Sequence, residues 1–176
     1  MKASPIKVMA TALLFAAALV ATRPGTAPAQ TRPAAASLCR APEAVLFTCQ
    51  VGARTVSICG RTKEQGGAVY RYGRPGRLEV EATDLHRAFE GWFGGGETQA
   101  YVDTPTHRYV VFDRMVRTGF DEEGHNIPRM TQGLLVQSGG RTVVNRECAQ
   151  PLGREPPAFD QRLLETLVPE GDYVPH

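Results

Sequence analysis

Residues 133–148 read Gly-Leu-Leu-Val-Gln-Ser-Gly-Gly-Arg-Thr-Val-Val-Asn-Arg-Glu-Cys, two apolar runs on either side of a glycine pair. The central Ser-Gly-Gly-Arg, 138–141, predicts a two-residue hairpin loop, because glycine accepts the positive φ angles of a primed turn. This loop would place Val136 opposite Val143. The stretch therefore predicts an antiparallel β-hairpin.

The same pattern runs through most of the chain. From Val45 onward, apolar and polar residues alternate in short runs that turn residues interrupt every eight to twelve positions, roughly the spacing of all-β domains. The sequence predicts a single antiparallel β-barrel or barrel-like sandwich of about eight strands over residues 39–150. The expected strands are 44–51, 55–60, 67–73, 77–82, 98–103, 107–116, 131–138 and 141–148.

Three stretches depart from this pattern. Residues 83–93 carry a capping residue and then Leu85 and Phe89 at helical spacing, which predicts a short helix. Residues 117–130 are polar and predict a long loop. In the C-terminal extension, 151–176, Asp160 would cap a short helix over 161–167, and the last nine residues are expected to be frayed.

The N-terminus has the layout of a secretory signal peptide over residues 1–29. Two lysines precede an apolar run of about thirteen residues, and a small-residue triplet, Ala27-Pro28-Ala29, follows. An uncleaved anchor is the alternative, but the run is too short for a bilayer core of ~30 Å. We expect a periplasmic or secreted protein with no membrane span after signal cleavage, and a disordered lead-in over residues 30–38.

Composition argues against a nucleic-acid partner. The whole chain has 20 basic and 18 acidic residues, but Lys2, Lys7 and Arg23 lie in the signal. The mature chain therefore has 17 basic against 18 acidic residues, a formal charge of −1. A surface of mixed and balanced charge lacks the basic patch that nucleic-acid binding requires.

The four cysteines predict structural disulfides. Cys39, Cys49, Cys59 and Cys148 allow three pairings, between which the sequence alone does not choose. No two are spaced as a closed zinc site prefers, and there is no Cys-x-x-Cys pair of the redox type.

Motifs for catalysis, cofactors and metals are absent from the sequence. The four histidines do not pair at metal-ligand spacing, and the acidic loop 121–126 lacks the alternating oxygen ligands of a calcium hand. No Gly-x-Ser-x-Gly motif occurs. We expect a non-enzymatic protein; the alternative is a hydrolase whose triad assembles only in space.

One segment stands out as a candidate binding site. Residues 89–97 read Phe-Glu-Gly-Trp-Phe-Gly-Gly-Gly-Glu, three aromatic residues beside a glycine triplet. Such a segment suits contact with a partner, but we favour the interpretation that its aromatic residues plug the open end of a barrel while the glycines let the chain turn. The candidate binding residues are Phe89, Trp92, Phe93, Gly94, Gly95, Gly96, Glu97 and Tyr101.

A resemblance covers residues 39–148. It is carried by Leu46-Phe-Thr-Cys49-Gln-Val-Gly-Ala-Arg-Thr-Val-Ser-Ile-Cys59-Gly, Tyr70-Arg-Tyr-Gly73, the glycine triplet 94–96 and the hairpin 133–148. On these motifs the chain resembles a set of small exported bacterial β proteins to which no function is attached. The resemblance implies an exported β protein.

A looser resemblance reaches the c-type lysozyme inhibitors, small periplasmic antiparallel barrels. Phe47-Thr-Cys49-Gln-Val-Gly52 and the closing Cys148 fit the frame of that family. The resemblance implies pairing of Cys49 with Cys148, which leaves Cys39 for Cys59. The family's inhibitory Ser-Gly-x-x-Tyr loop has no counterpart, since the corresponding stretch, 95–101, reads Gly-Gly-Glu-Thr-Gln-Ala-Tyr.

The sequence thus predicts an exported, non-enzymatic protein that binds an unknown protein or cell-envelope partner through residues 89–101. A lysozyme-inhibitor-like protein and a hydrolase are the alternatives.

Overall fold

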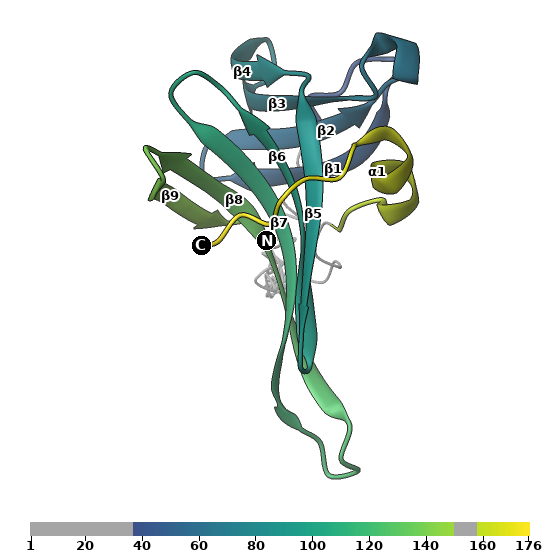
Figure 1. Ribbon diagram of the computed structural model, residues 1–176, viewed down its shortest axis with the longest axis vertical. Coiled ribbons are helices and arrows are strands. Elements are labelled where there is room, and N and C mark those ends of the chain that lie inside the picture. Colours follow the sequence, from purple (N-terminus) through teal and green to yellow (C-terminus); the bar gives the residue numbers. More distant parts are fainter. Residues whose placement is uncertain (1–36, 150–157) are drawn as a thin grey trace, which may run out of the picture. The chain divides into compact units, whose positions relative to one another are not determined.

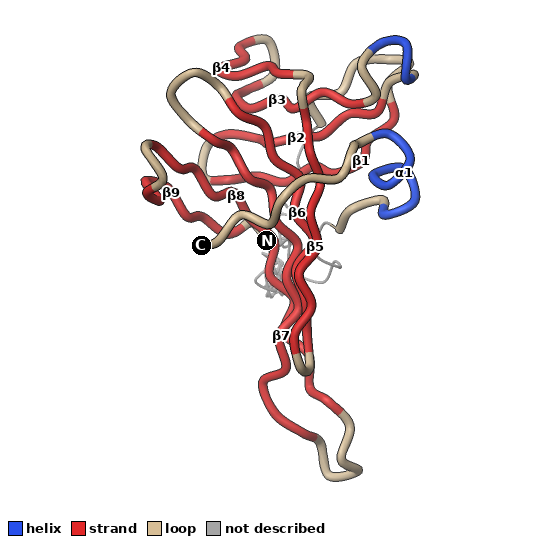
Figure 2. Tube along the Cα trace, viewed as in Figure 1, coloured by secondary structure: helices blue, strands red, loops and turns tan. Residues whose placement is uncertain are grey.

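Two antiparallel sheets form most of the part of the chain that this computed structural model describes, residues 37–149 and 158–176 (Figure 1, Figure 2). The first sheet consists of β1 (Ala44–Val51), β2 (Arg54–Gly60), β3 (Ala68–Arg74) and β4 (Arg77–Ala82). The second consists of β5 (Leu85–Trp92), β6 (Gly95–Asp103), β7 (Arg108–Phe120), β8 (Asn126–Ser138) and β9 (Arg141–Glu147). In both sheets the strands follow one another in chain order.

Two short helices complete the described fold. The 3-10 helix Lys63–Gln65 lies between β2 and β3, and α1 (Gln161–Leu167) follows the second sheet. The prediction of this C-terminal helix is confirmed. Asp160 caps it, because its carboxylate accepts the backbone N–H of Leu163 at 3.0 Å.

The fold is a sandwich. Among the described residues the two sheets share no strand pairing, so the expectation of a β-rich antiparallel fold is confirmed and its barrel form is wrong. The chain passes from β4 to β5 through Thr83 and Asp84 alone, and β5 then begins the other sheet. This switch leaves an edge strand on each side of the break.

The predicted helix over 83–93 is wrong, because these residues form β5. Leu85 and Phe89 lie four apart, and residues four apart share a face in a strand as well as in a helix. Pairing decides between the two: β5 pairs with β6 along its whole length, from Leu85 opposite Val102 to Trp92 opposite Gly95.

The predicted polar loop over 117–130 is also wrong. β7 continues to Phe120 and β8 begins at Asn126, so only residues 121–125 form the turn, with Gly124 at φ 84°. The β8–β9 loop is confirmed, since Gly139 and Gly140 have φ of 56° and 74°. A bulge after Val136 shifts the register, so that Val136 pairs with Val144 rather than Val143.

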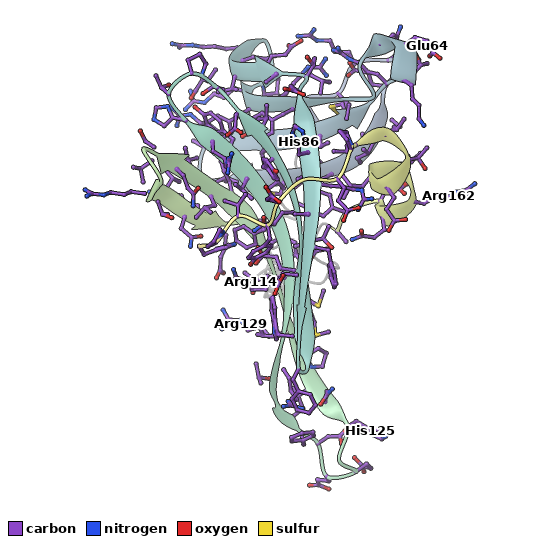
Figure 3. The ribbon with its side chains drawn as sticks, viewed as in Figure 1. Glu64, His86, Arg114, His125, Arg129 and Arg162 are labelled. Atoms are coloured by element: carbon purple, nitrogen blue, oxygen red, sulfur yellow. A yellow bond between two sulfur atoms is a disulfide. The ribbon has the colours of Figure 1, made fainter. Side chains whose placement is uncertain are left out.

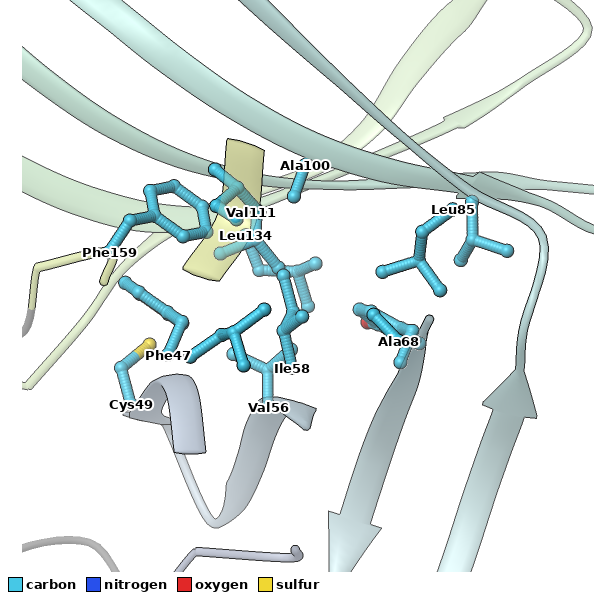
Figure 4. Close-up of a cluster of buried hydrophobic side chains, with 14 of the residues drawn as sticks. Phe47, Cys49, Val56, Ile58, Ala68, Leu85, Ala100, Val111, Leu134 and Phe159 are labelled. Atoms are coloured by element: carbon cyan, nitrogen blue, oxygen red, sulfur yellow. The ribbon is translucent and has the colours of Figure 1, made fainter. Parts of the chain in front are cut away.

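The hydrophobic core lies between the two sheets (Figure 4). Phe47 and Ile58 of the first sheet and Leu134 and Val111 of the second are buried in one cluster. Phe159, just before α1, packs on Phe47 with ring centroids 4.9 Å apart. The segment that leads into α1 therefore closes this core.

Two disulfides each join a strand of the first sheet to another segment of the chain. Cys39 pairs with Cys59 and Cys49 with Cys148, the pairing that the lysozyme-inhibitor resemblance implies. The second bridge joins β1 to the residue after β9 and so links the two sheets. Structural disulfides are typical of oxidising compartments outside the cytoplasm. Within the described residues no helix has the length and hydrophobicity that crossing a membrane requires.

A buried ion cluster anchors the start of the domain. The side chain of Arg71 is fully buried and donates to both carboxylate oxygens of Glu43 and to Glu81 at 3.3 Å. It also donates to the carbonyl of Leu38 at 3.2 Å. Leu38, which the sequence places in the lead-in, is itself buried, so the packed structure begins before Cys39.

Truncation of Phe47 should test the core assignment. We expect Phe47→Ala to lower the free energy of unfolding by about 3–5 kcal/mol, through lost burial and the cavity left beneath Phe159. The control is Val143→Ala, at an exposed position on β9, which should change it by no more than about 0.5 kcal/mol. Urea unfolding measures both, and equal effects would contradict the core described above.

The Glu43–Arg71 pair should make stability depend on acid pH. The hydrogen bond from Arg71 lowers the pKa of Glu43 from 4.5 to about 2. A depressed carboxyl pKa stabilises the fold above the unfolded pKa, and this contribution is lost as pH falls from about 5 to about 2. We expect the loss of unfolding free energy in Glu43→Gln to be largest near neutral pH and to shrink by about 3 kcal/mol at the acid end. A difference between variant and wild type that stays constant with pH would contradict the pairing.

Candidate functional site

The second sheet extends past the first because its strands are longer. β7 and β8 have 13 residues each, whereas the strands of the first sheet have 6 to 8. We call residues 89–98 and 113–131, where the second sheet continues, the arm (Figure 1). β6 accompanies β7 only as far as Met115, so about 17 Å of β7 and β8 continue as a two-stranded ribbon.

One face of the arm continues the side of the sheet that faces the core. Val111 lies in the core, and side chains two and four residues further along β7, Asp113 and Met115, point to the same side. Opposite them on β8 lie Gln132 and Met130, and on β5 the matching residue is Phe89. We call this side of the arm its inner face.

The inner face loses its cover at a defined place. Asp113 accepts the Nε2 amide of Gln132 at 2.7 Å, and its burial raises its pKa. Gln161, the first residue of α1, donates to Thr98 at 3.4 Å. The start of α1 therefore lies over the last polar residues of this face.

At and just beyond this boundary, large apolar side chains of the inner face are exposed. Phe89 is 66% exposed and Met130 is 44% exposed. Together with Met115 they line an open hollow of about 250 Å³. Glycines give the hollow its floor: the ring of Phe89 lies over Gly96, where an added Cβ would meet it at 3.0 Å.

Gly95 brings β6 and β7 into close approach. A Cβ at this position would lie 2.1 Å from the carbonyl oxygen of Met115 and 2.6 Å from Nε1 of Trp92. Glycine is therefore required here for packing. Close packing of the strands, and not contact with a ligand, therefore explains why Gly95 of the triplet 94–96 is a glycine.

An arginine lies between two exposed aromatic rings further along the arm. The guanidinium of Arg117 is 4.5 Å from the ring centroid of Phe93 and 4.7 Å from that of Phe120. These distances suit cation–π contacts. Phe93 is nevertheless 88% exposed, so the contact leaves most of the ring available.

The tip of the arm is acidic. Asp121, Glu123 and His125 bring potential metal ligands within 4.8 Å of one another, and Figure 3 shows His125 at this end. The Asp121 carboxylate accepts the backbone N–H groups of Glu123 and His125 at 3.1 and 2.7 Å. Turn formation therefore accounts for this cluster.

The outer face of the sheet is covered by the C-terminal tail, residues 168–176. Gln99 exchanges two hydrogen bonds with the backbone of Val174, at 2.8 and 2.9 Å, and Val174 is buried. Next to it, the fully buried carboxylate of Glu97 accepts hydrogen bonds from Gln99, His176 and Arg114. The expectation of a frayed C-terminus is wrong, because these contacts hold it.

The Glu97 carboxylate is ionised in this setting. Burial acts to raise its pKa, but hydrogen bonds from His176, Gln99 and Arg114 outweigh burial and lower it. A charge that is already compensated inside the protein holds the tail in place and is not accessible to a ligand.

The structure divides the predicted site residues into two groups. Phe89, Trp92 and Phe93 are exposed, and with Gly94, Gly95 and Gly96 they lie at the distal end of the β5–β6 hairpin. Glu97 and Tyr101 are buried on the outer face, so their assignment as contact residues is wrong. The alternation of β6 explains the division, because Glu97 and Tyr101 point away from the inner face.

Sequence reasoning missed the other half of the arm. Met115, Arg117, Phe120 and Met130 lie in or beside the stretch that was expected to be a polar loop. The signal was the turn sequence around Gly124 with Phe120 before it and Ile127 after it. Strand pairing across this turn brings Met115 and Met130 next to Phe89, and Arg117 next to Phe93.

Within the described residues, no imidazole hydrogen-bonds a serine or cysteine side chain. The imidazole of His107 hydrogen-bonds Thr106, that of His125 hydrogen-bonds Asp121, and that of His176 hydrogen-bonds Glu97. Each of these contacts belongs to a turn or to the attached tail.

Trp92, the only tryptophan, reports on this end of the hairpin. It is 38% exposed, so the interpretation as a plug is wrong. We expect Trp92→Ala to lower the free energy of unfolding by about 1 kcal/mol, not the 3–5 kcal/mol of a buried aromatic residue. In the folded wild type, acrylamide should quench the tryptophan fluorescence readily. A strongly blue-shifted, unquenchable emission would contradict the exposure.

Comparison with models of known protein families, with curated proteins and with solved structures finds no match. The candidate site therefore stands on the geometry of this chain alone.

Proposed function

We propose that this protein is exported and non-enzymatic, and that it binds a protein partner through the inner face of its arm. Two disulfides support an oxidising location, and the signal-like N-terminus predicts export. The proposal keeps Phe89 and Phe93, which the sequence singled out, and adds the exposed apolar residues of β7 and β8.

The exposed apolar side chains of the inner face carry the proposal. Phe89 and Met130 are exposed around one hollow of the arm, and Phe93 and Phe120 are exposed on either side of Arg117 further along it. Contiguous exposed apolar surface marks interaction sites in soluble proteins. Covering one such side chain contributes about 1.5–3 kcal/mol, and a few buried side chains carry most of the binding energy at protein interfaces.

A free two-stranded ribbon gains stability from being covered. Isolated hairpins are marginally stable in water, and β7 and β8 continue alone beyond Met115. The aromatic and arginine content of this part matches the residue types that dominate binding energy at protein interfaces. Phe93 and Phe120 on either side of Arg117 are the expected anchor.

The charge of the tip favours a protein over a membrane surface. An arm that entered a bilayer by its end would first bring Asp121, Glu122 and Glu123 to the headgroups. Anionic lipid headgroups repel such a cluster and attract basic segments. The apolar residues lie along the side of the arm, where a protein surface can cover them.

The two alternatives from the sequence gain no support from the geometry. The stretch that would correspond to the inhibitory loop of lysozyme inhibitors, 95–101, lies within β6, an interior strand. For the hydrolase alternative, no described serine or cysteine lies at hydrogen-bond distance from an imidazole, and the hydroxyl that His107 contacts belongs to its sequence neighbour Thr106 in the β6–β7 turn.

Removing the anchor should abolish partner capture. We expect Phe93→Ser combined with Phe120→Ser to reduce by at least about tenfold the envelope proteins that immobilised wild type retains, because two hot-spot side chains are lost. The matched control is Val143→Ser, an exposed apolar residue on β9 away from the arm.

Quantitative mass spectrometry of retained proteins measures the difference, and urea unfolding verifies that both variants are folded. Equal retention by the double variant and the wild type, or equal loss in the control, would contradict binding through the arm.

A further inference from the structure

Along the arm, the edge of β5 that faces away from β6 is free. Arg87 uses both backbone groups on this side: its N–H donates to the carbonyl of Pro169 and its carbonyl accepts from the N–H of Gly171, each at 2.8 Å. In an antiparallel sheet these directions repeat every second residue, so Phe89 and Gly91 direct their N–H and C=O groups to the same edge. Among the described residues, pairing on this side of β5 is confined to Arg87.

At Arg87 this edge of β5 already pairs with backbone from another segment, through a single isolated bridge. The tail runs parallel to β5 there, with Arg87 bridged to Glu170. It then turns onto the outer face, where Tyr173 and Val174 reach Glu97 and Gln99. The edge at Phe89 and Gly91 is thus continuous with the position where β5 already makes backbone hydrogen bonds to the tail.

The side chains next to this free edge indicate which residue types an added strand would carry. Phe89 points to the inner face, beside the apolar hollow. Glu90 points to the outer face and is exposed, opposite Glu97 on β6. The charge of Glu97 is compensated by Arg114 and His176, but the Glu90 carboxylate makes no ion pair or hydrogen bond with another described side chain. A strand laid along β5 would place its own side chains about 5 Å from both Phe89 and Glu90.

We propose that the partner adds an extended segment to the edge of β5 between Phe89 and Trp92. This segment carries apolar side chains toward the inner face and a lysine or arginine toward Glu90. The inference rests on the proposed function and specifies how the partner binds. Strand addition of this kind obtains affinity from backbone hydrogen bonds and specificity from alternate side chains.

Short synthetic peptides can probe this edge directly. Three peptides of alternating residues are used: valine with lysine, valine with glutamate and valine with glutamine. In the 15N-labelled protein we expect the lysine peptide to bind at least about fivefold more tightly than the glutamate peptide, through its cation next to Glu90. Hydrogen exchange at the amides of Phe89 and Gly91 should slow when it binds.

Two matched substitutions separate the backbone from the side chains. Gly91→Pro removes the outward N–H, whereas Gly91→Ala retains it, and a Cβ there meets only the Phe89 ring, at 3.3 Å. We expect Gly91→Pro to bind the lysine peptide about fivefold more weakly than Gly91→Ala. Glu90→Gln, which leaves the backbone unchanged, should remove the preference for the lysine peptide over the glutamate peptide.

Each result bears on the inference. It is overturned if the three peptides bind alike, if Gly91→Pro binds as Gly91→Ala does, or if the two amides exchange as fast with peptide as without it. It is also overturned if these amides are protected without peptide in proportion to protein concentration, because a second copy then occupies the edge. If Gly91→Pro retains the envelope proteins that the Phe93/Phe120 double variant loses, the edge inference fails while binding through the arm stands.

Discussion

The structure depends on a mismatch between the lengths of its two sheets. A sandwich buries the inner face of each sheet against the other, and this works only where both sheets are present. Here the first sheet ends while β7 and β8 continue. The apolar residues of the longer sheet continue past the point where the first sheet ends. Phe89, Met115 and Met130 therefore extend the inner face into solvent. The candidate site is the part of the core face that the fold does not cover.

The C-terminal residues determine where this cover ends. Phe159 and α1 close the inner side of the sheet, and Gln161 marks the boundary at Thr98. The tail then pairs with β5 at Arg87 and crosses to the outer face, where Val174 completes a second buried cluster. One segment thus covers both faces and part of an edge. The arm begins where residues 159–176 no longer cover the second sheet.

Much of the first sheet could be predicted from the sequence, because tight turns with the right glycines set sequence neighbours against each other. β1 and β4 were predicted with correct bounds, and the turn before β9 has the positive φ angles its glycines allow. β5 was missed because the spacing of Leu85 and Phe89 suits a helix and a strand equally, and only the pairing with β6 decides. The β7–β8 part of the arm was missed because residues 117–130 are mostly polar and contain Gly124 and Pro128, a composition typical of a loop. Half of the site was found through its aromatic residues, but Glu97 and Tyr101 were misplaced, since only the strand register shows which side they face.

The central claim is that the inner face of the arm is open to solvent in the protein alone, and hydroxyl-radical footprinting tests it most directly. In the folded protein without a partner, Phe89, Phe93, Phe120 and Met130 should be labelled at rates close to those in the urea-unfolded chain. The buried Phe47 and Phe112 should be strongly protected in the same sample. Protection of the four arm residues to the level of Phe47 would contradict the claim and would mean that the protein already covers this face itself.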